Sequence, residues 1–266
     1  MHCFKVASLF FFLIFISSCK SSETKIIESP FSSFDETKIA YTDEGDGEPV
    51  LLIHGFISNG SSWNKTVLKK SLIDQGYRVI VPDLRGNGKS DKPQNAKAYQ
   101  NDAEIKDLIG LADYLQLDSY MTIGYSRGSI VLAKLLTKEN RISKAVIGGM
   151  GVDFTNPDWD RELMFAAAFR GETTPETEGA VAYAKSINAD LKSLHLQQKH
   201  QPVTSVAELK TIKAKVLVIA GKEDTDNGHP KALQKAIPKS RLKIVPGDHN
   251  GTYKTAKFSK AICSFL

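Results

Sequence analysis

The chain has 266 residues, of which 41% are hydrophobic and 24% are charged, with 19 glycines and 10 prolines. This is an ordinary globular composition, and it excludes a disordered, collagen-like or coiled-coil chain as the main description. The 35 basic and 30 acidic residues give a net charge of +5, which is too small to indicate a nucleic-acid partner.

The first residues resemble an export signal. Lys5 precedes an apolar run over residues 6–16, which as a helix would span about 16 Å and would be too short to cross a bilayer. A basic start, a short apolar stretch and small residues after it are typical of a secretory signal. The segment ends Ile16-Ser17-Ser18-Cys19, which resembles the lipobox of bacterial lipoproteins. In that family cleavage precedes the cysteine and its thiol is lipidated, so the resemblance predicts a signal peptide over residues 1–18 and a lipid on Cys19.

Residues 19–30 are polar and serine-rich, which indicates a tether between the lipid and the folded domain. Lys20 follows the cysteine, whereas an aspartate at that position favours retention in the inner membrane of lipoprotein-bearing cells. The resemblance therefore implies export and attachment by lipid to the cell envelope, at the outer membrane. Cys3 falls in the signal and Cys19 would carry the lipid, so Cys263 has no partner for an internal disulfide.

The remaining chain alternates between two kinds of segment. Short apolar runs, most of them followed by glycine, have the composition of strands buried on both faces of a parallel sheet. They are residues 38–42, 50–53, 79–81, 121–123, 145–147, 216–219 and 242–245. Helical patterns lie between them, at about 64–75, 99–116, 127–137, 230–236 and 253–265. The order predicts an α/β protein with a doubly wound, mostly parallel sheet, in which residues 38–42 form an antiparallel strand near one edge.

Residues from about 153 to 211 break this alternation, because they contain helical patterns and no strand run. Thr174-Pro175 has the form of a helix cap with proline at the first helical position, and residues 180–193 continue as a helix. We expect a short helical cap, inserted over the sheet after the sixth strand. Five of its large apolar side chains either line a pocket or only pack the cap onto the sheet: Phe154, Trp159, Met164, Phe165 and Phe169.

The pattern G-x-S-x-G occurs at residues 124–128, directly after a predicted strand and before a predicted helix. This context fits a sharp turn that lifts a serine hydroxyl clear of the sheet, with glycines allowing the strand and the helix to approach each other. Ser126 is therefore the candidate nucleophile. A serine hydroxyl needs a neighbouring base to react near neutral pH.

His249 is the favoured base, because it lies just after the last predicted strand and can reach a serine two strands away, although His54 and His229 remain in reach. An acid must orient the imidazole and stabilise its charged form. Asp224 follows the penultimate strand and is favoured for that role. The competing carboxylates are Glu223, Asp226 and Asp153.

The order Ser126, Asp224, His249 resembles that of the α/β-hydrolase fold, in its lid-bearing, esterase-like branch. The resemblance covers residues 31–266, including the cap at about 153–211. His54-Gly55-Phe56 resembles the oxyanion loop of the family, which implies that the backbone N–H groups of Phe56 and Arg127 bind the oxyanion.

The resemblance implies a serine hydrolase that cleaves a small or medium carboxylic ester through an acyl-enzyme, with no cofactor and no metal. Relatives that are haloalkane dehalogenases or epoxide hydrolases carry aspartate in place of Ser126. Two alternatives remain: a non-catalytic binding or receptor lipoprotein on the same scaffold, and a C–C hydrolase or aminopeptidase relative. The expected partners are a small ester-type molecule and, through the N-terminal lipid, a membrane; the oligomeric state is not predicted.

Residues 83–90 match a further family segment, D-x-R-G-x-G-x-S, which we interpret as a structural turn with an ion pair between Asp83 and Arg85. The end of this segment also resembles a phosphate-binding loop. That motif requires glycine where the chain has Asp83, so a nucleotide site is excluded.

Overall fold

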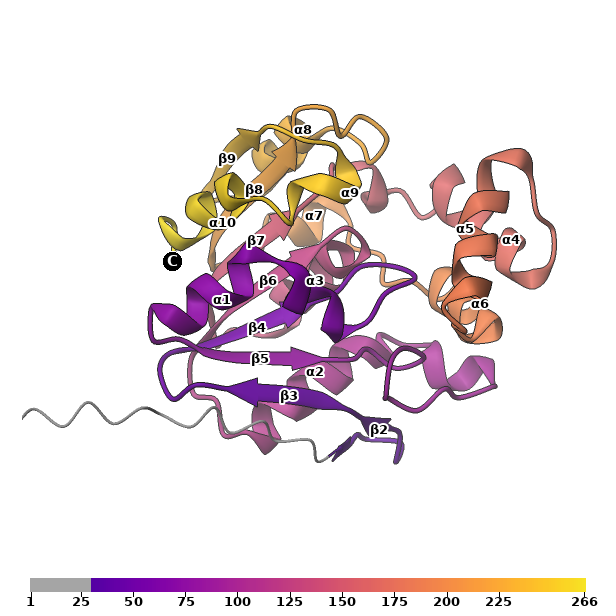
Figure 1. Cartoon of the computed structure of the whole chain (residues 1–266), viewed down its shortest axis with the longest axis horizontal. Coiled ribbons are helices and arrows are strands. Elements are labelled where there is room, and N and C mark those ends of the chain that lie inside the picture. Colours follow the sequence, from indigo (N-terminus) through magenta and orange to yellow (C-terminus); the bar gives the residue numbers. More distant parts are fainter. Residues whose placement is uncertain (1–29) are drawn as a thin grey trace, which may run out of the picture.

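The computed structural model describes residues 30–266 (Figure 1). The predicted signal peptide, Cys19 and all of the predicted tether except Pro30 lie outside the described residues. The strands are β1 (Phe31–Ser32), β2 (Lys38–Ile39), β3 (Tyr41–Glu44), β4 (Pro49–Ile53), β5 (Arg78–Pro82), β6 (Tyr120–Tyr125), β7 (Ile142–Gly148), β8 (Lys215–Gly221) and β9 (Ser240–Val245). The α-helices are α1 (Val67–Asp74), α2 (Ala103–Tyr114), α3 (Arg127–Lys138), α4 (Asp160–Arg170), α5 (Pro175–Ser186), α6 (Leu191–Lys199), α7 (Val206–Leu209), α8 (Pro230–Ala236), α9 (His249–Thr252) and α10 (Ala256–Cys263).

Seven strands form one sheet in the order β3-β5-β4-β6-β7-β8-β9. β3 is antiparallel to β5, and the remaining pairs are parallel. β1 and β2 form a separate antiparallel pair. The prediction of a mostly parallel α/β sheet with an antiparallel edge strand is confirmed.

The sheet is covered by helices on both faces, which explains why its strands are continuously apolar. All six residues of β6 are buried. One core joins the sheet to α2, α3 and α8, and includes Leu108, Leu132 and Leu233. The other joins the opposite face to α1 and α10, and includes Leu68 and Phe258. Figure 1 shows the two helical layers on either side of the sheet.

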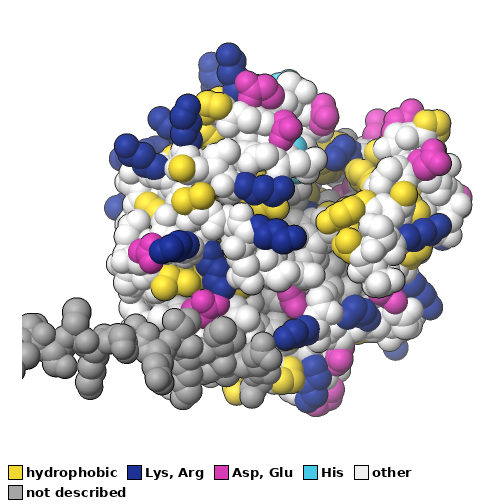
Figure 2. All heavy atoms as spheres, in the orientation of Figure 1, with side chains coloured by type: hydrophobic (Ala, Val, Ile, Leu, Met, Phe, Trp, Pro, Cys, Tyr) yellow, Lys and Arg dark blue, Asp and Glu magenta, His cyan; other side chains and the backbone are white. Residues whose placement is uncertain are grey.

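Residues 153–211 form the predicted helical segment, with α4, α5, α6 and α7 between β7 and β8. It follows β7, which is the fifth strand of the seven-stranded sheet in chain order, whereas insertion after the sixth strand was expected. α4 to α6 stand at one side of the body (Figure 1), and Figure 2 shows a hollow between the two parts.

The predicted helix over residues 180–193 is two helices in the structure. α5 begins after Thr174, which forms a capping box with Thr177, as the Thr-Pro pair predicted. It ends at Ser186, and Asn188 then adopts a left-handed conformation with φ of 53°. Asp190 caps the next helix by accepting a hydrogen bond from the Ser193 N–H. Two local signals, a turn residue and an N-cap, thus outweigh the continuous helical pattern.

Candidate active site

Ser126 occupies a strained turn between β6 and α3. Its φ of 54° and ψ of −128° lie in a region that residues with side chains rarely adopt. A Cβ on Gly124 would lie 2.4 Å from the Gly128 carbonyl oxygen, and a Cβ on Gly128 would lie 2.4 Å from the Ile53 carbonyl oxygen. Both glycines are therefore required for the close approach of β6, α3 and β4 that presents the Ser126 hydroxyl.

His249 lies beside Ser126, although 123 residues separate them in the chain. Its Nε2 is 2.9 Å from the Ser126 Oγ, and its Nδ1 is 2.8 Å from the Asp224 Oδ2. Asp224 follows β8 and His249 follows β9, which is the next parallel strand of the sheet. The structure thus brings the three predicted side chains together in one hydrogen-bonded series at the carboxyl edge of the sheet.

The competing histidines have other surroundings. His54 is buried, donates from Nδ1 to the Gly55 carbonyl oxygen at 2.8 Å, and accepts from the Leu84 N–H at 3.0 Å. This pattern fixes a neutral imidazole that braces the loop, and burial lowers the pKa of His54. The side chain of His229 is 85% exposed and lies 3.9 Å from Asp153. Neither ring has the contacts of His249 with Ser126.

The carboxylates that compete with Asp224 are also engaged elsewhere. Glu223 accepts a hydrogen bond from the Gly247 N–H, and Asp226 accepts one from Thr225. Burial by itself would raise the pKa of Asp224, but hydrogen bonds from His249 and Asn227 and the charge of His249 bring it below its ordinary value. An ionised carboxylate at this position can orient the imidazole and stabilise its protonated form.

Asn227 is a site residue that the sequence analysis missed. Its Nδ2 lies 2.9 Å from the Asp224 Oδ1 and 2.9 Å from the His249 Nδ1. Since the Nδ1–H of His249 donates to Asp224, that nitrogen has no free lone pair, and the approach of Asn227 to it is only a contact. Asn227 therefore acts by donating to Asp224.

Tyr125, the residue before Ser126, contacts both the backbone and the ring of His249. Its hydroxyl donates to the His249 carbonyl oxygen at 2.7 Å, and its ring stacks on Tyr253 with centroids 4.8 Å apart. The rings of Tyr125 and His249 lie 5.4 Å apart. The variable position of G-x-S-x-G gave no signal of this role, which depends on the fold of the loop after β9.

The loop after β4 lies against the nucleophile, as the resemblance implied. A Cβ on Gly55 would meet the Ser126 Cβ at 3.3 Å. Within residues 30–266, the backbone N–H groups of Phe56 and Arg127 donate to no protein acceptor. Two free donors beside a serine hydroxyl can stabilise the negative oxygen of a tetrahedral intermediate.

The side chain of Arg127 connects the body to the helical segment. Its Nη1 and Nη2 bond both oxygens of Glu104 on α2, at 2.9 and 2.6 Å. Nη2 also donates to the Gln197 carbonyl oxygen on α6 at 3.1 Å. Arg127 and Glu104 are both buried, so this two-pronged ion pair lies out of solvent directly behind Ser126.

A cavity of about 340 Å³ opens over Ser126 and His249 and continues beneath the helical segment. Of the five large apolar side chains considered above, Trp159 and Phe165 line it. Phe154 and Phe169 are buried in packing instead. The wall of the cavity that the helical segment forms also carries polar side chains, from α4 and from α6 and the residues after it: Arg161, Glu162, Gln198 and Gln201.

Glu162 is an unusual carboxyl group in this wall. It is only 8% exposed, and its Oε2 accepts a hydrogen bond from the Gln201 Nε2 at 2.8 Å. Burial raises the pKa of Glu162 to about 7, against the opposing effects of Gln201 and of the Arg127 charge. The side chain therefore changes its charge near neutral pH.

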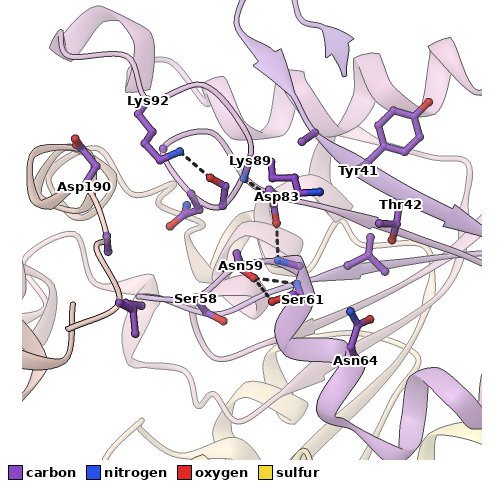
Figure 3. A pocket seen from close by; sticks show the side chains of 18 of the residues that line it. Tyr41, Thr42, Ser58, Asn59, Ser61, Asn64, Asp83, Lys89, Lys92 and Asp190 are labelled. Atoms are coloured by element: carbon purple, nitrogen blue, oxygen red, sulfur yellow. Dashed lines mark hydrogen bonds between the residues drawn. The ribbon is translucent and has the colours of Figure 1, made fainter. Parts of the chain in front are cut away.

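A second cavity, of about 500 Å³, lies beside β3, between the loop after β4 and the segment 83–92 (Figure 3). None of the Ser126, Asp224 and His249 side chains lines it. Asp83 organises its wall: Oδ1 accepts from the Gly60 N–H at 2.6 Å and Oδ2 from the Lys89 N–H at 2.7 Å.

The predicted ion pair between Asp83 and Arg85 is wrong. Arg85 is 0% exposed and bonds both oxygens of Asp107 at 2.6 Å, together with Asp35 at 3.0 Å. The error arises because Asp83 accepts hydrogen bonds from backbone N–H groups, whereas the partners of Arg85 are carboxylates from distant parts of the chain. The glycine-rich segment is structural, as expected.

Within residues 30–266, no group of three or more His, Cys, Asp or Glu side chains is placed to hold a metal ion. The same residues include no helix with the length and apolar character needed to cross a membrane.

Known proteins with similar sequences match parts of this chain. An epoxide hydrolase from Caballeronia sordidicola is 36% identical over 88 residues, which are 33% of this chain and 26% of that protein. The chain spans less than half of the length of the curated relatives that it matches.

Solved structures agree over more of the chain. An esterase from Exiguobacterium antarcticum has a TM-score of 0.76 at 23% identity, over 90% of this chain and 99% of that one. A bromoperoxidase from Bacillus anthracis has a TM-score of 0.71 at 25% identity, over 88% of this chain and 98% of that one. The sequence pattern of the alpha/beta hydrolase fold matches residues 48–199, which is more than half of the chain. The chain therefore belongs to the alpha/beta hydrolase fold family.

Proposed function

We propose that the protein is a serine hydrolase that cleaves a small or medium carboxylic ester through an acyl-enzyme on Ser126. One observation carries the proposal: the hydrogen-bonded series from the Ser126 Oγ through His249 to Asp224, with spacings of 2.9 and 2.8 Å. These are the spacings that a nucleophile, its base and the orienting acid require. Membership of the alpha/beta hydrolase fold family supports a hydrolase in general.

In the first half of the reaction, the Ser126 Oγ attacks the ester carbonyl carbon while His249 Nε2 takes the hydroxyl proton. The carbonyl oxygen becomes negative and accepts hydrogen bonds from the N–H groups of Phe56 and Arg127, each worth about 3 kcal/mol in the transition state. The C–O bond then breaks, the alcohol leaves with the proton from His249, and the acyl group stays on Ser126.

In the second half, water attacks the acyl carbon and gives a proton to His249. The intermediate collapses, the proton returns to Ser126, and a carboxylic acid leaves. Asp224 stays ionised throughout and stabilises the imidazolium in both halves. Its pKa, held below the ordinary value by its hydrogen bonds and the charge of His249 despite burial, suits this role.

The volume of the cavity and the identity of the nucleophile restrict the class of substrate. A cavity of about 340 Å³ lies at the lower end of the range for small-molecule sites, which suits a small or medium ester. Epoxide hydrolases of this fold use aspartate as the nucleophile, and this chain has Ser126 there. A serine favours acyl transfer over epoxide opening, despite the similarity to an epoxide hydrolase.

A fluorophosphonate probe tests the proposal, because it reacts only with a serine that a base activates. We expect labelling at Ser126, hydrolysis of p-nitrophenyl esters, and a fall in kcat of about 10³-fold or more in Ser126→Ala. Ser186→Ala, which changes an exposed serine at the end of α5, is the matched control and should retain full activity. Absence of both labelling and ester hydrolysis would instead favour a non-catalytic binding protein. Hydrolysis of aminoacyl amides or of C–C bonds with inert esters would favour those relatives.

We further propose that the protein is exported and held at the cell envelope by a lipid on Cys19, at the outer membrane. The support is the sequence alone: a short apolar run after Lys5, followed by Ile16-Ser17-Ser18-Cys19. With this anchor, the ester-cleaving domain would work outside the cytoplasm.

A further inference from the structure

Arg161, in the first turn of α4, lies in the wall of the cavity that contains Ser126 and His249. It is partly buried, and within residues 30–266 it makes no ion pair or hydrogen bond. Its guanidinium carbon lies 5.1 Å from the centre of the Phe165 ring. Burial lowers the pKa of Arg161, and the charges of Asp226 and Asp224, which do not bond to it, act in the opposite direction. A guanidinium that has lost part of its hydration without gaining an acceptor indicates a missing anionic partner.

A second guanidinium donor in the same wall is unused. The Nη atoms of Arg127 are bonded to Glu104 and to the Gln197 carbonyl, but its Nε is buried and has no hydrogen-bond partner. Arg127 also lines the cavity. Buried N–H groups are almost always paired in folded proteins, so an unpaired one beside a substrate cavity requires an explanation.

None of the charged groups that the structure describes around the cavity forms a direct ion pair with Arg161. Glu104 already balances Arg127 through two hydrogen bonds, and Asp224 is engaged by His249 and Asn227. Glu162 is the remaining carboxyl group, and because burial raises its pKa to about 7, much of it is uncharged at neutral pH and below. The wall therefore presents, near the nucleophile, a guanidinium with no direct anionic partner in the described part of the chain, on which Asp226 and Asp224 act only through space.

We propose that the ester substrate carries a carboxylate, and that Arg161 binds this carboxylate while Ser126 attacks the ester carbonyl. The inference rests on the proposed function, and it names the class of substrate: a half-ester of a dicarboxylic acid, or an ester of a hydroxy acid. The planar fork of arginine matches the two oxygens of a carboxylate, and the partly desolvated setting strengthens such a bond. Gln198 and Gln201 add neutral hydrogen-bonding groups to the lining of the same cavity.

Matched ester pairs test the proposal with the full domain. One pair places the charge in the acyl part: mono-p-nitrophenyl adipate against p-nitrophenyl hexanoate. The other places it in the alcohol part: 4-acetoxybenzoate against phenyl acetate. For at least one pair we expect kcat/KM to favour the charged ester by about tenfold or more, the gain typical of a charge-assisted hydrogen bond. In Arg161→Gln this ratio should fall to near one, and in Arg161→Lys it should fall less, because the charge remains but the fork is lost.

Arg170→Gln is the matched control, because Arg170 lies at the far end of the same helix and pairs at the surface with Glu172. Its ratio should equal that of the wild type. A wild-type ratio near one for both pairs, with neutral esters still cleaved, would overturn the inference and leave the proposed function standing. A preference that survives in Arg161→Gln would also overturn it, since another group would then bind the carboxylate. Loss of fluorophosphonate labelling and of all ester hydrolysis in the wild type would instead refute the proposed function. If Arg161→Gln does not fold, the ratio in Arg161→Lys decides the question.

Discussion

Replacing Glu162 with glutamine should remove a pH-dependent loss of stability. Burial raises the pKa of this carboxyl group from 4.5 to about 7 in the folded chain. Below pH 4.5 both the folded and the unfolded chains hold the proton, so the group contributes nothing. Between these values the unfolded chain releases the proton and the folded chain keeps it, so the free energy of unfolding falls as the pH rises.

The size of this fall follows from the same two values. A tenfold difference in proton affinity is worth about 1.4 kcal/mol, so the interval between 4.5 and about 7 corresponds to about 3 kcal/mol at most. Solvent in the cavity screens part of this, so we expect a loss of about 1–3 kcal/mol, complete above pH 7. The glutamine of Glu162→Gln never ionises, and its carbonyl oxygen can still accept the hydrogen bond from Gln201.

Urea unfolding of the wild type and of Glu162→Gln at about pH 4.5 and about pH 8 measures this difference, and effects of the other titrating groups cancel between the two proteins. Relative to the wild type, the variant should gain about 1–3 kcal/mol on going to the higher pH. Glu172→Gln, at a side chain that is 62% exposed, should run parallel to the wild type. Parallel curves for Glu162→Gln as well would show that this carboxyl group ionises normally, and would remove one support for the inference about Arg161.

Three other changes test separate parts of the molecule. Asn227→Ala removes a hydrogen bond to Asp224, and should lower kcat about tenfold with a smaller change in KM. It should also move the acidic limb of the pH–rate profile to higher pH; an unchanged profile would make Asn227 a purely structural residue. Arg85→Met leaves the buried Asp107 carboxylate unpaired, and should reduce the free energy of unfolding by about 3–5 kcal/mol in urea titrations; a loss under about 1 kcal/mol would contradict that account. Cys19→Ser should release the protein from membranes without detergent, whereas continued membrane attachment would refute the lipid anchor.

The sheet was predictable because its signals are local. Each buried strand is a short apolar run, and glycines at or just after the ends of β4, β6 and β8 mark the places where the chain turns at the carboxyl edge. The predicted helix ends were less accurate: the helix predicted at 253–265 is α10, which is shorter, and the separate short helix α9 before it was not predicted. Such ends depend on single caps, which compete with the hydrophobic pattern and are easily overlooked in it.

The residues of the site likewise include some that local signals predicted and some that they did not. Ser126, Asp224 and His249 follow strands, so the topology alone indicated that they could meet. Asn227 and the side chain of Arg161 gave no sequence signal, because their roles depend on how a loop and a helical segment fold back over the sheet. Pairings between distant residues are set by tertiary packing, which neighbours in sequence do not reveal.

Arg127 takes part both in the local turn at the nucleophile and in the tertiary packing of the helical segment. Its backbone N–H is fixed by the strained turn at Ser126, whereas its guanidinium is bonded to Glu104 on α2 and to α6 of the helical segment. Both charges are buried, so separating them would leave an unpaired ion in the protein interior, at a cost of several kcal/mol. That cost fixes the guanidinium on α2, and its hydrogen bond to the Gln197 carbonyl then holds α6, and with it the cavity wall that carries Arg161, against the body. The arginine of G-x-S-x-G thus links the geometry of the nucleophile to the position of the segment that covers it.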